Sequence, residues 1–375
     1  MPIDSMAPNS KLNAKRKAAR ETTKIKPQKP KEEKPTVLSP IPLELQQLLL
    51  NIFRSTFAER FETDINPLLQ EVKGHLYNRD FAAAFGNKRY LEAYAARWSP
   101  SRALGYAETF WDVKEHLFSN HIPNPEDQDE RVGEGEGGKK CWKVVCLGGG
   151  AGAEIVALAG VQKMLSAGEG EIKETGNHKM YVTAIDNADW SAVVKTLATQ
   201  LETTPTLSKF ASAAAKAANT PLLTPGSFNI TFTKHDVLAP ESLDMVSCLQ
   251  NASLVTLLFT LNELYSASLP LTQRFLLGLT ANMRPGSLLI VIDSPGSYSS
   301  VTLNGAEKKY PMQWLLDHTL LKQANGNQKV RGEEEVPRWK KLHEDESKWF
   351  RMDEELTYPI ELENMRMQVH LYRRI

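Results

Sequence analysis

The amino-acid sequence predicts an α/β protein with a mostly parallel, Rossmann-like sheet, an N-terminal helical region before it and an antiparallel C-terminal hairpin closing it. From Trp142 onward, strand-like and helix-like segments alternate, which is typical of a parallel sheet with helices on both faces. A short apolar run enters a glycine-rich turn at 144–152. Near the end, the strand-like segments 356–362 and 367–372 have only a short connection, which predicts antiparallel neighbours.

The first 38 residues form a basic segment that we expect to be disordered. Residues 1–34 contain ten lysines and arginines against four acidic residues, with almost no large apolar side chains. Such an arm can contact phosphates or serve as a nuclear address, or it can be a solvated tail without a specific role. The whole chain has a formal net charge of zero, so its overall charge indicates no partner.

Residues 40–121 are predicted to form a helical region. Leu45, Leu49, Phe53 and Phe57 recur every fourth residue, as on one face of an amphipathic helix. Pro100 is expected to break the helical pattern that surrounds it. Segment 122–140, rich in acidic residues and glycine, is predicted to be a linker. The further helices are expected at 65–72, 78–85, 88–98 and 102–118.

The α/β domain is predicted to cover residues 141–375. A parallel sheet with an antiparallel C-terminal hairpin is the arrangement of class I methyltransferases, whereas a dinucleotide dehydrogenase more often continues with another crossover unit. Three cysteines are too few for a disulfide framework. Without an 18-residue apolar span or a signal sequence, we expect a soluble, intracellular protein that uses no membrane. Strands are expected at 143–147, 180–185, 228–233, 254–261 and 287–292.

The glycine turn predicts the cofactor. Gly148, Gly150 and Gly152 are followed by Glu154. Their G-x-G-x-G spacing differs from the G-x-G-x-x-G of dinucleotide sites and suits S-adenosylmethionine (SAM). A helix N-terminus after the turn offers free N–H groups to a ligand. The alternative is a tight strand-to-helix connection without a ligand.

Acidic residues follow the next two predicted strands. Asp186 is expected to accept hydrogen bonds from the ribose hydroxyls, by the logic of dinucleotide sites. Asp236 would accept from the adenine amino group, and the backbone N–H of Val237 would donate to the ring. The alternatives are a turn-forming role for Asp186 and a helix cap at Asp236.

The segment after the fourth strand is expected to lie beside the transferred methyl group. Asn262 could accept a hydrogen bond from a base N–H, and Glu263 could remove a proton or hold the methionyl amine. The alternative is that both simply begin a helix, where an acid is favoured. Asp293, after the fifth strand, is more readily explained as part of a turn than as part of the pocket for the methyl acceptor. Carbon methylation of a pyrimidine normally needs a cysteine nucleophile, and no cysteine follows either strand, so transfer to nitrogen or oxygen is favoured. No cysteine–histidine cluster has zinc spacing, so no metal is expected.

Four segments together resemble a fungal family of SAM-dependent enzymes that methylate N3 of a uridine in large-subunit (25S) ribosomal RNA. The resemblance implies a SAM cofactor, large-subunit ribosomal RNA or a pre-ribosomal particle as the substrate, and a nuclear or nucleolar location, with the cytoplasm as a further site. It implies no catalytic base. The segments are 70–81, 91–104, 144–154 and 358–366.

Tyr94, Trp98, Arg97 and Arg102 are candidate substrate residues. They could contact phosphate and stack on a flipped base, although Tyr94 and Trp98 could equally pack their helix on the core. The alternative functions are a methyltransferase for a protein or small molecule, a non-catalytic assembly factor with a SAM fold, and, least favoured, an NAD enzyme.

Overall fold

The computed structural model describes residues 39–118, 141–168, 179–206, 210, 212–213, 219–240, 242–296, 298–303, 306–325 and 337–375. The predicted tail at 1–38 and the predicted linker at 122–140 lie outside the described residues. The remaining segments belong to one unit, Pro40–Ile375.

The strands of this unit form one large sheet and one small one. The described strands are β1 (Cys141–Leu147), β2 (Lys179–Asp186), β3 (Phe228–Lys234), β4 (Leu254–Leu258), β5 (Leu288–Asp293), β6 (Tyr298–Leu303), β7 (Ala306–Pro311), β8 (Trp339–Phe350) and β9 (Met365–Arg374).

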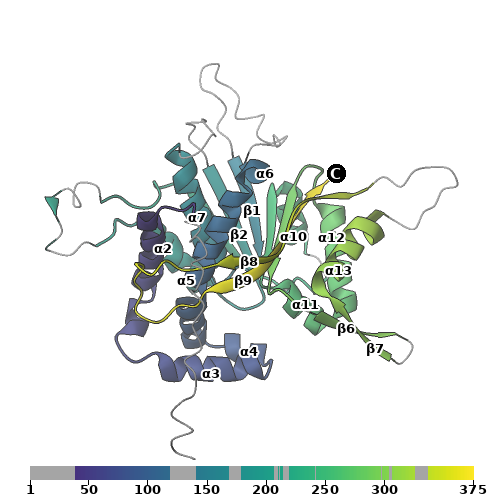
Figure 1. Cartoon of the computed structure of the whole chain (residues 1–375), viewed down its shortest axis with the longest axis horizontal. Coiled ribbons are helices and arrows are strands. Elements are labelled where there is room, and N and C mark those ends of the chain that lie inside the picture. The colour runs from purple at the N-terminus through teal and green to yellow at the C-terminus, as the bar shows by residue number, and fades with distance from the viewer. Residues whose placement is uncertain are drawn as a thin grey trace, which may run out of the picture. The chain divides into compact units, whose positions relative to one another are not determined.

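The large sheet has seven strands in the order β3-β2-β1-β4-β5-β9-β8, and β6 pairs with β7 in a separate hairpin. Strands β1 to β5 are parallel, whereas β9 is antiparallel to both β5 and β8. This topology confirms the predicted fold class. Because the parallel strands share one direction, their carboxyl ends meet at one edge of the sheet, which is the lower edge in Figure 1.

Helices cover both faces of the large sheet. Within the described ranges, none has the length together with the apolar character that crossing a bilayer requires. The helices before the sheet are α2 (Leu43–Thr56), the 3-10 helix η1 (Ala58–Phe61), α3 (Asn66–Tyr77), α4 (Phe81–Phe85), α5 (Lys88–Asp112) and α6 (Lys114–Phe118). The later ones are α7 (Ala153–Ser166), α8 (Ser191–Leu201), α10 (Leu243–Asn251), α11 (Leu261–Ala267), α12 (Leu269–Asn282) and α13 (Met312–Asp317), followed by the short π-helix η3 (His318–Lys322) and the 3-10 helix η4 (Gln323–Asn325).

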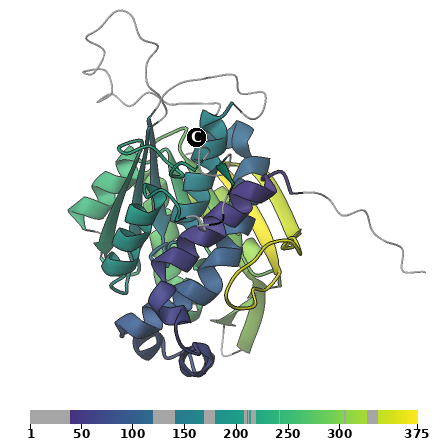
Figure 2. The ribbon, with the colours of Figure 1, turned by 90° about the vertical axis from the view of Figure 1, so that its left-hand side faces the viewer.

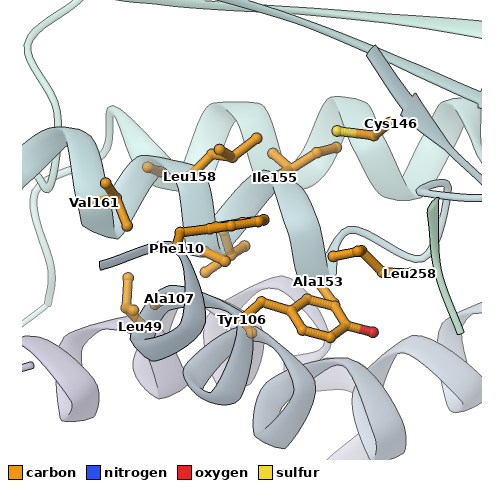
Figure 3. Packing of buried hydrophobic residues seen from close by; sticks show 14 of the residues in the cluster. Leu49, Tyr106, Ala107, Phe110, Cys146, Ala153, Ile155, Leu158, Val161 and Leu258 are labelled. Atoms are coloured by element: carbon orange, nitrogen blue, oxygen red, sulfur yellow. The ribbon is translucent and has the colours of Figure 1, made fainter. Parts of the chain in front are cut away.

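Each face of the sheet has its own hydrophobic core. Helices α2, α5, α7 and α8 contribute to one core, and α10 to α13 contribute to the other. Helix α7 is almost wholly buried because α5 packs on its outer side. Figure 3 shows Phe110 of α5 beside Ile155 and Leu158 of α7, and Tyr106 of α5 beside Ala153. The N-terminal helices, purple and blue in Figure 2, therefore form an outer layer on this face.

Helix α5 continues through Pro100, so the predicted break at this residue is wrong. A proline inside a helix has no N–H to donate to the carbonyl four residues earlier, which here belongs to Ala96. The hydroxyl of Tyr358 donates to that carbonyl instead, at 2.9 Å. A residue of the C-terminal segment thus replaces the hydrogen bond that Pro100 cannot make.

We expect Tyr358→Phe to lower the free energy of unfolding by about 1–3 kcal/mol, because the buried carbonyl of Ala96 loses this partner. Urea unfolding measures the change. In the Pro100→Ala background, where residue 100 again carries an N–H, the same substitution should cost less. An equal cost in both backgrounds would contradict this explanation.

Strands β8 and β9 form the C-terminal hairpin, so the prediction of a strand at 356–362 is wrong. Leu356, Tyr358, Ile360 and Leu362 are partly buried against the core that contains the N-terminal helices, and the residues between them are exposed. An extended segment lying across helices has the same two-residue alternation as a strand. The alternation at 356–362 therefore predicted correctly which side chains are buried. It predicted wrongly that this segment is the strand that pairs with β9.

Candidate functional site at the carboxyl edge of the sheet

The glycine turn directly follows β1, and it lies beside the residues that follow β4. Gly148 has a φ of +78°, and a Cβ placed on it would lie 2.3 Å from Oγ1 of Thr260. A Cβ on Gly150 would lie 2.1 Å from Cδ1 of Trp190. Gly152 then begins α7 with a φ of +84°. Side chains would not fit at these positions, so the backbone itself forms the surface of the turn.

Asp186 connects this turn to the end of β2. Its Oδ2 accepts the N–H of Gly150 at 3.2 Å, and its Oδ1 accepts the N–H of Ala188 at 3.2 Å. Burial raises the pKa of this carboxyl group above its ordinary value, against the effect of the hydrogen bonds that it accepts. The structure thus brings Asp186 to the glycine turn, and its contact with Ala188 fits the turn-forming alternative that the sequence left open. The ribose-binding role stays a prediction.

Asp236 and Val237 follow β3 at the same edge. Asp236 is exposed, and its Oδ1 accepts the N–H of Leu238 at 2.9 Å. This contact lies in a turn, whereas the alternative that the sequence left open for Asp236 was a helix cap. Val237 is half-buried and lines a cavity of about 240 Å³. The other side of this cavity could not be predicted from the sequence, because helix α12 supplies it from a distant part of the chain. Those α12 residues are Leu271, Arg274 and Phe275.

Glu154 lies beneath the glycine turn, in the core. It is 2% exposed, and the hydroxyl of Thr256 donates to its Oε2 at 2.6 Å. Burial raises the pKa of Glu154 to about 7, and its hydrogen bonds with Thr256 and Cys146 oppose the shift. This geometry favours support of the turn from below, whereas the sequence placed Glu154 among the cofactor-binding residues.

We expect the stability advantage of Glu154→Gln over the wild type to grow by about 2 kcal/mol between pH 5 and pH 7.5. The pKa of about 7 in the folded state exceeds the unfolded value of roughly 4.3. The folded wild type therefore holds an extra proton in this window, and its stability falls as the pH rises. Glutamine stays neutral throughout.

Urea unfolding of both proteins at several pH values measures this difference, because other titrating groups contribute equally to both. Glu59→Gln changes an exposed side chain and should give a flat difference. A pH-independent difference for Glu154→Gln would contradict the buried proton.

Asp293 connects the ends of β4 and β5. It is 2% exposed, its Oδ2 accepts the N–H of Asn262 at 2.9 Å, and its Oδ1 accepts the N–H of Ser294 at 2.7 Å. Burial raises the pKa of Asp293 to about 6. The sequence favoured a plain turn at this residue over a place in the acceptor pocket. An acid directly after the wholly apolar run Leu288–Ile292 was the signal that could have identified it.

Asn262 and Glu263 lie in the first turn of α11, which is the arrangement that the sequence left as an alternative. Glu263 is nevertheless exposed at the carboxyl edge. Burial raises its pKa, and the charges of Arg79 and Arg102 act in the opposite direction. Just before these residues, Phe259 has a φ of 52°, a strained conformation of the kind that clusters at functional sites.

Arg102 is a predicted substrate residue that contacts this group. Its guanidinium carbon is 5.0 Å from the ring centre of Phe259, and its Nη1 donates to the hydroxyl of Tyr94 at 2.8 Å. It also interacts electrostatically with Glu263 and Asp293. Helix α5 therefore brings a cation to the carboxyl edge of β4 and β5.

The other three predicted substrate residues have partners within the protein. Arg97, whose side chain is 9% exposed, is paired with Glu363. Tyr94 lies 4.8 Å from Trp98 and 5.9 Å from Trp190 between ring centres. These ring contacts favour the packing role that the sequence left open for Tyr94 and Trp98.

This packing holds helix α5 against the glycine turn. The hydroxyl of Ser99 donates to the carbonyl of Ala151 at 2.8 Å. Trp190, which is 2% exposed, lies over Gly150 and also contacts Phe85. The N-terminal helices are therefore part of the structure around the turn.

We expect Gly150→Ala to destabilise the protein by about 1–3 kcal/mol, because the new methyl group must displace the indole of Trp190. Thermal or urea unfolding measures the change. Gly74→Ala is the matched control, because nothing lies within 4 Å of its Cβ position. It should leave stability unchanged or raise it by up to about 1 kcal/mol. Equal effects of the two substitutions would contradict the crowding at Gly150.

The chain is similar to known methyltransferases. Residues 53–373 match a family model described as "Putative SAM-dependent methyltransferase". The 25S rRNA (uridine(2843)-N(3))-methyltransferase of Saccharomyces cerevisiae is 35% identical over 344 residues, which cover 87% of this chain and 85% of that protein. Within the described residues, no group of three or more histidine, cysteine, aspartate or glutamate residues could hold a metal ion.

Solved structures of methyltransferases were also found. A SAM-dependent methyltransferase from Methanosarcina mazei is 11% identical, with a TM-score of 0.34, over 68% of this chain and 98% of that one. The N-methyltransferase NodS from Bradyrhizobium japonicum is 10% identical, with a TM-score of 0.28, over 62% of this chain and 85% of that one. The match of the family model across most of the sequence shows that this chain belongs to the family of SAM-dependent methyltransferases.

Proposed function

We propose that this protein transfers the methyl group of SAM to N3 of a uridine in large-subunit ribosomal RNA. The observation that carries the proposal is the 35% identity, over most of both chains, to a yeast enzyme named for this reaction. The carboxyl-edge site supports it, because that edge is where open α/β sheets bind their ligands. A role in ribosome biogenesis implies a nuclear or nucleolar location, which belongs to the same proposal.

The residues around the glycine turn fit SAM. The N–H groups of Gly148, Gly150 and Gly152 donate to acceptors within the protein. The donors proposed to face the ligand are instead the first N–H groups of α7, which have no partner four residues earlier in a helix. Asp186 lies within hydrogen-bond distance of this turn and is proposed to accept from the ribose hydroxyls. Asp236 and Val237 are proposed to contact the adenine. Bound SAM supplies an electrophilic methyl group on its sulfonium.

The proposed role of the protein is to position the uridine and to remove its N3 proton. Accurate positioning can contribute roughly 7–11 kcal/mol to lowering the barrier, and a general base contributes about 10²–10⁴-fold in rate. Glu263 is the proposed base, because its carboxylate is exposed at this edge and partial burial raises its pKa. Asp293 holds the backbone of Asn262, which positions the start of α11.

Mass spectrometry of ribosomal RNA nucleosides tests the proposal. Cells lacking this protein should lose one N3-methyluridine from large-subunit RNA, and re-expression of the wild type should restore it. An unchanged nucleoside profile would contradict the substrate. Purified protein with SAM and large-subunit RNA should form N3-methyluridine in a single turnover, which a non-catalytic assembly factor would not do.

A further inference from the structure

We propose that the outer face of the β8–β9 hairpin, together with α13, binds unpaired nucleotides of the RNA substrate. The inference rests on the proposed function, because it concerns how the RNA reaches the carboxyl edge. Three of the four substrate residues expected from the sequence are already held by protein partners, so the RNA needs another surface. We call that surface the aromatic–arginine patch, and it consists of Tyr310, Trp314, His318, Trp349, Arg351 and Arg366.

Two exposed tryptophans mark the patch. All seven tryptophans of the chain lie in its described part, and only Trp314, at 45%, and Trp349, at 52%, are exposed. Tryptophan is highly buried on average, and clustered exposed apolar surface often marks an interaction site.

Neighbouring side chains pack against the rings of Trp314 and Trp349 and restrict their conformations. The ring of Trp314 lies 5.0 Å from Tyr310 and 5.1 Å from His318, with interplanar angles of 20° and 15°. The guanidinium carbons of Arg351 and Arg366 each lie 5.6 Å from the ring centre of Trp349. The aromatic surfaces are therefore ordered before any ligand arrives, which lowers the entropic cost of binding.

The two arginines keep their charge available. Arg366 donates from Nε to the hydroxyl of Ser347 at 2.7 Å. Among the residues that the structure describes, no carboxylate lies within 4.0 Å of a nitrogen of Arg351 or Arg366. Both guanidinium groups can therefore contact phosphate, which arginine binds through paired N–H donors.

The patch adjoins the proposed catalytic edge. Trp349 pairs with Arg366 across β8 and β9, and Gln368 pairs with Asp293 at the end of β5. Gln368 also donates to the carbonyl of Ser294 at 2.8 Å. Arg366 is two residues before Gln368, so it lies on the same face of β9, about 7 Å further along the strand. Trp349 and Arg366 therefore lie just beyond the end of β5.

Helix α13 lies beside this hairpin on the same face. Nε2 of Gln313 donates to Oε1 of Glu346 at 3.2 Å, and Nζ of Lys341 contacts Oδ2 of Asp317 at 2.8 Å. Figure 1 shows that α13 follows directly on the β6–β7 hairpin, which projects from the carboxyl edge. Helix α13, which carries Trp314, is thus a direct neighbour of the β8–β9 hairpin, which carries Trp349.

Unpaired RNA is the ligand that this chemistry fits. Aromatic rings stack on any base, and arginines contact phosphates, so an accessible strand can use both. Bases inside a duplex are covered by their neighbours and cannot stack on protein rings. The acidic residues Glu344 and Glu346 on the same strand oppose a long run of phosphates and favour a short unpaired segment.

Fluorescence anisotropy with the full-length protein tests the proposal directly. The probes are a fluorescein-labelled oligouridine RNA and the same RNA annealed to oligoadenosine. Combined Trp314→Ala and Trp349→Ala should raise the Kd for the single strand about 30-fold to 10⁴-fold and leave SAM affinity unchanged. Arg366→Lys keeps the charge but loses the planar contact, so it should have a smaller effect. Tyr181→Ala removes an exposed aromatic residue of β2 and is the matched control.

The outcomes separate the patch from the proposed function. An unchanged Kd for the single strand in the tryptophan double variant overturns the patch, and so does an equal loss in the Tyr181→Ala control. If that variant binds RNA normally but no longer binds a purified ribosomal protein, the surface docks protein and the inference is wrong. If it loses RNA binding while the wild type forms no N3-methyluridine, the patch stands and the proposed function fails.

Discussion

Asp186→Ala should weaken SAM binding by about 10²–10⁴-fold. A hydrogen bond to a charged group contributes about 1.5–3 kcal/mol, and the proposed role gives Asp186 two of them, to the two ribose hydroxyls. Their loss corresponds to roughly 3–6 kcal/mol of binding free energy. Isothermal titration calorimetry with SAM measures the change.

Asp189→Ala is the matched control for this experiment. Asp189 lies in the same connection after β2 and accepts the N–H of Ser191 at 3.2 Å, but its side chain is exposed. Its removal should leave SAM affinity near the wild-type value. Thermal unfolding of both variants without SAM separates loss of binding from loss of fold, since Asp186 also accepts N–H groups of the protein. Wild-type affinity in a folded Asp186→Ala protein would contradict the ribose assignment.

The parallel sheet and the glycine turn could be predicted because their signals are local. The apolar run Val144–Leu147 and the glycines after it stand within a few consecutive residues, and both features appear in the structure. Asp186 was placed in the same way, as an acid that directly follows a strand. The spacing of apolar residues along the chain predicts which residues are buried. In a parallel sheet the buried strands run in one direction, so their carboxyl ends lie at the same edge.

Features that depend on distant partners could not be predicted. Pro100 is accommodated in a helix because Tyr358 bonds to the carbonyl of Ala96, from 262 positions away along the chain. Arg97 is paired with Glu363, which is 266 positions away. No local sequence pattern around Tyr358 or Glu363 predicts these contacts. These contacts explain why the substrate residues expected on α5 are mostly engaged within the protein.

The arrangement of the seven-stranded sheet also explains how the residues after β4 are positioned. In the sequence, Asn262 and Glu263 could either begin a helix or serve the reaction. The structure shows that they begin α11, and that Asp293 of the neighbouring strand binds the backbone N–H of Asn262. A helix start and a functional position are therefore compatible, because the buried Asp293 holds this turn and leaves the Glu263 side chain exposed.

Glu263→Gln should lower kcat for uridine methylation by about 10²–10⁴-fold, the usual contribution of a general base. The amide cannot take up the N3 proton, while its similar size preserves the packing. Partial burial raises the pKa of Glu263, so the wild-type rate should rise with pH through a range above the ordinary glutamate value of roughly 4.3. The variant should lack that limb. Single-turnover rates at several pH values measure both effects.

Binding measurements complete this test. Because Glu263 acts on the proton and not on the cofactor in this proposal, the Kd for SAM should be unchanged in Glu263→Gln. Glu59→Gln, at an exposed position of η1, should keep both the rate and the pH profile of the wild type. If Glu263→Gln retains the wild-type kcat and pH profile, positioning at the carboxyl edge provides the catalysis without this base. If it loses SAM affinity together with kcat, Glu263 instead holds the methionyl end of the cofactor, which is the other role open to it.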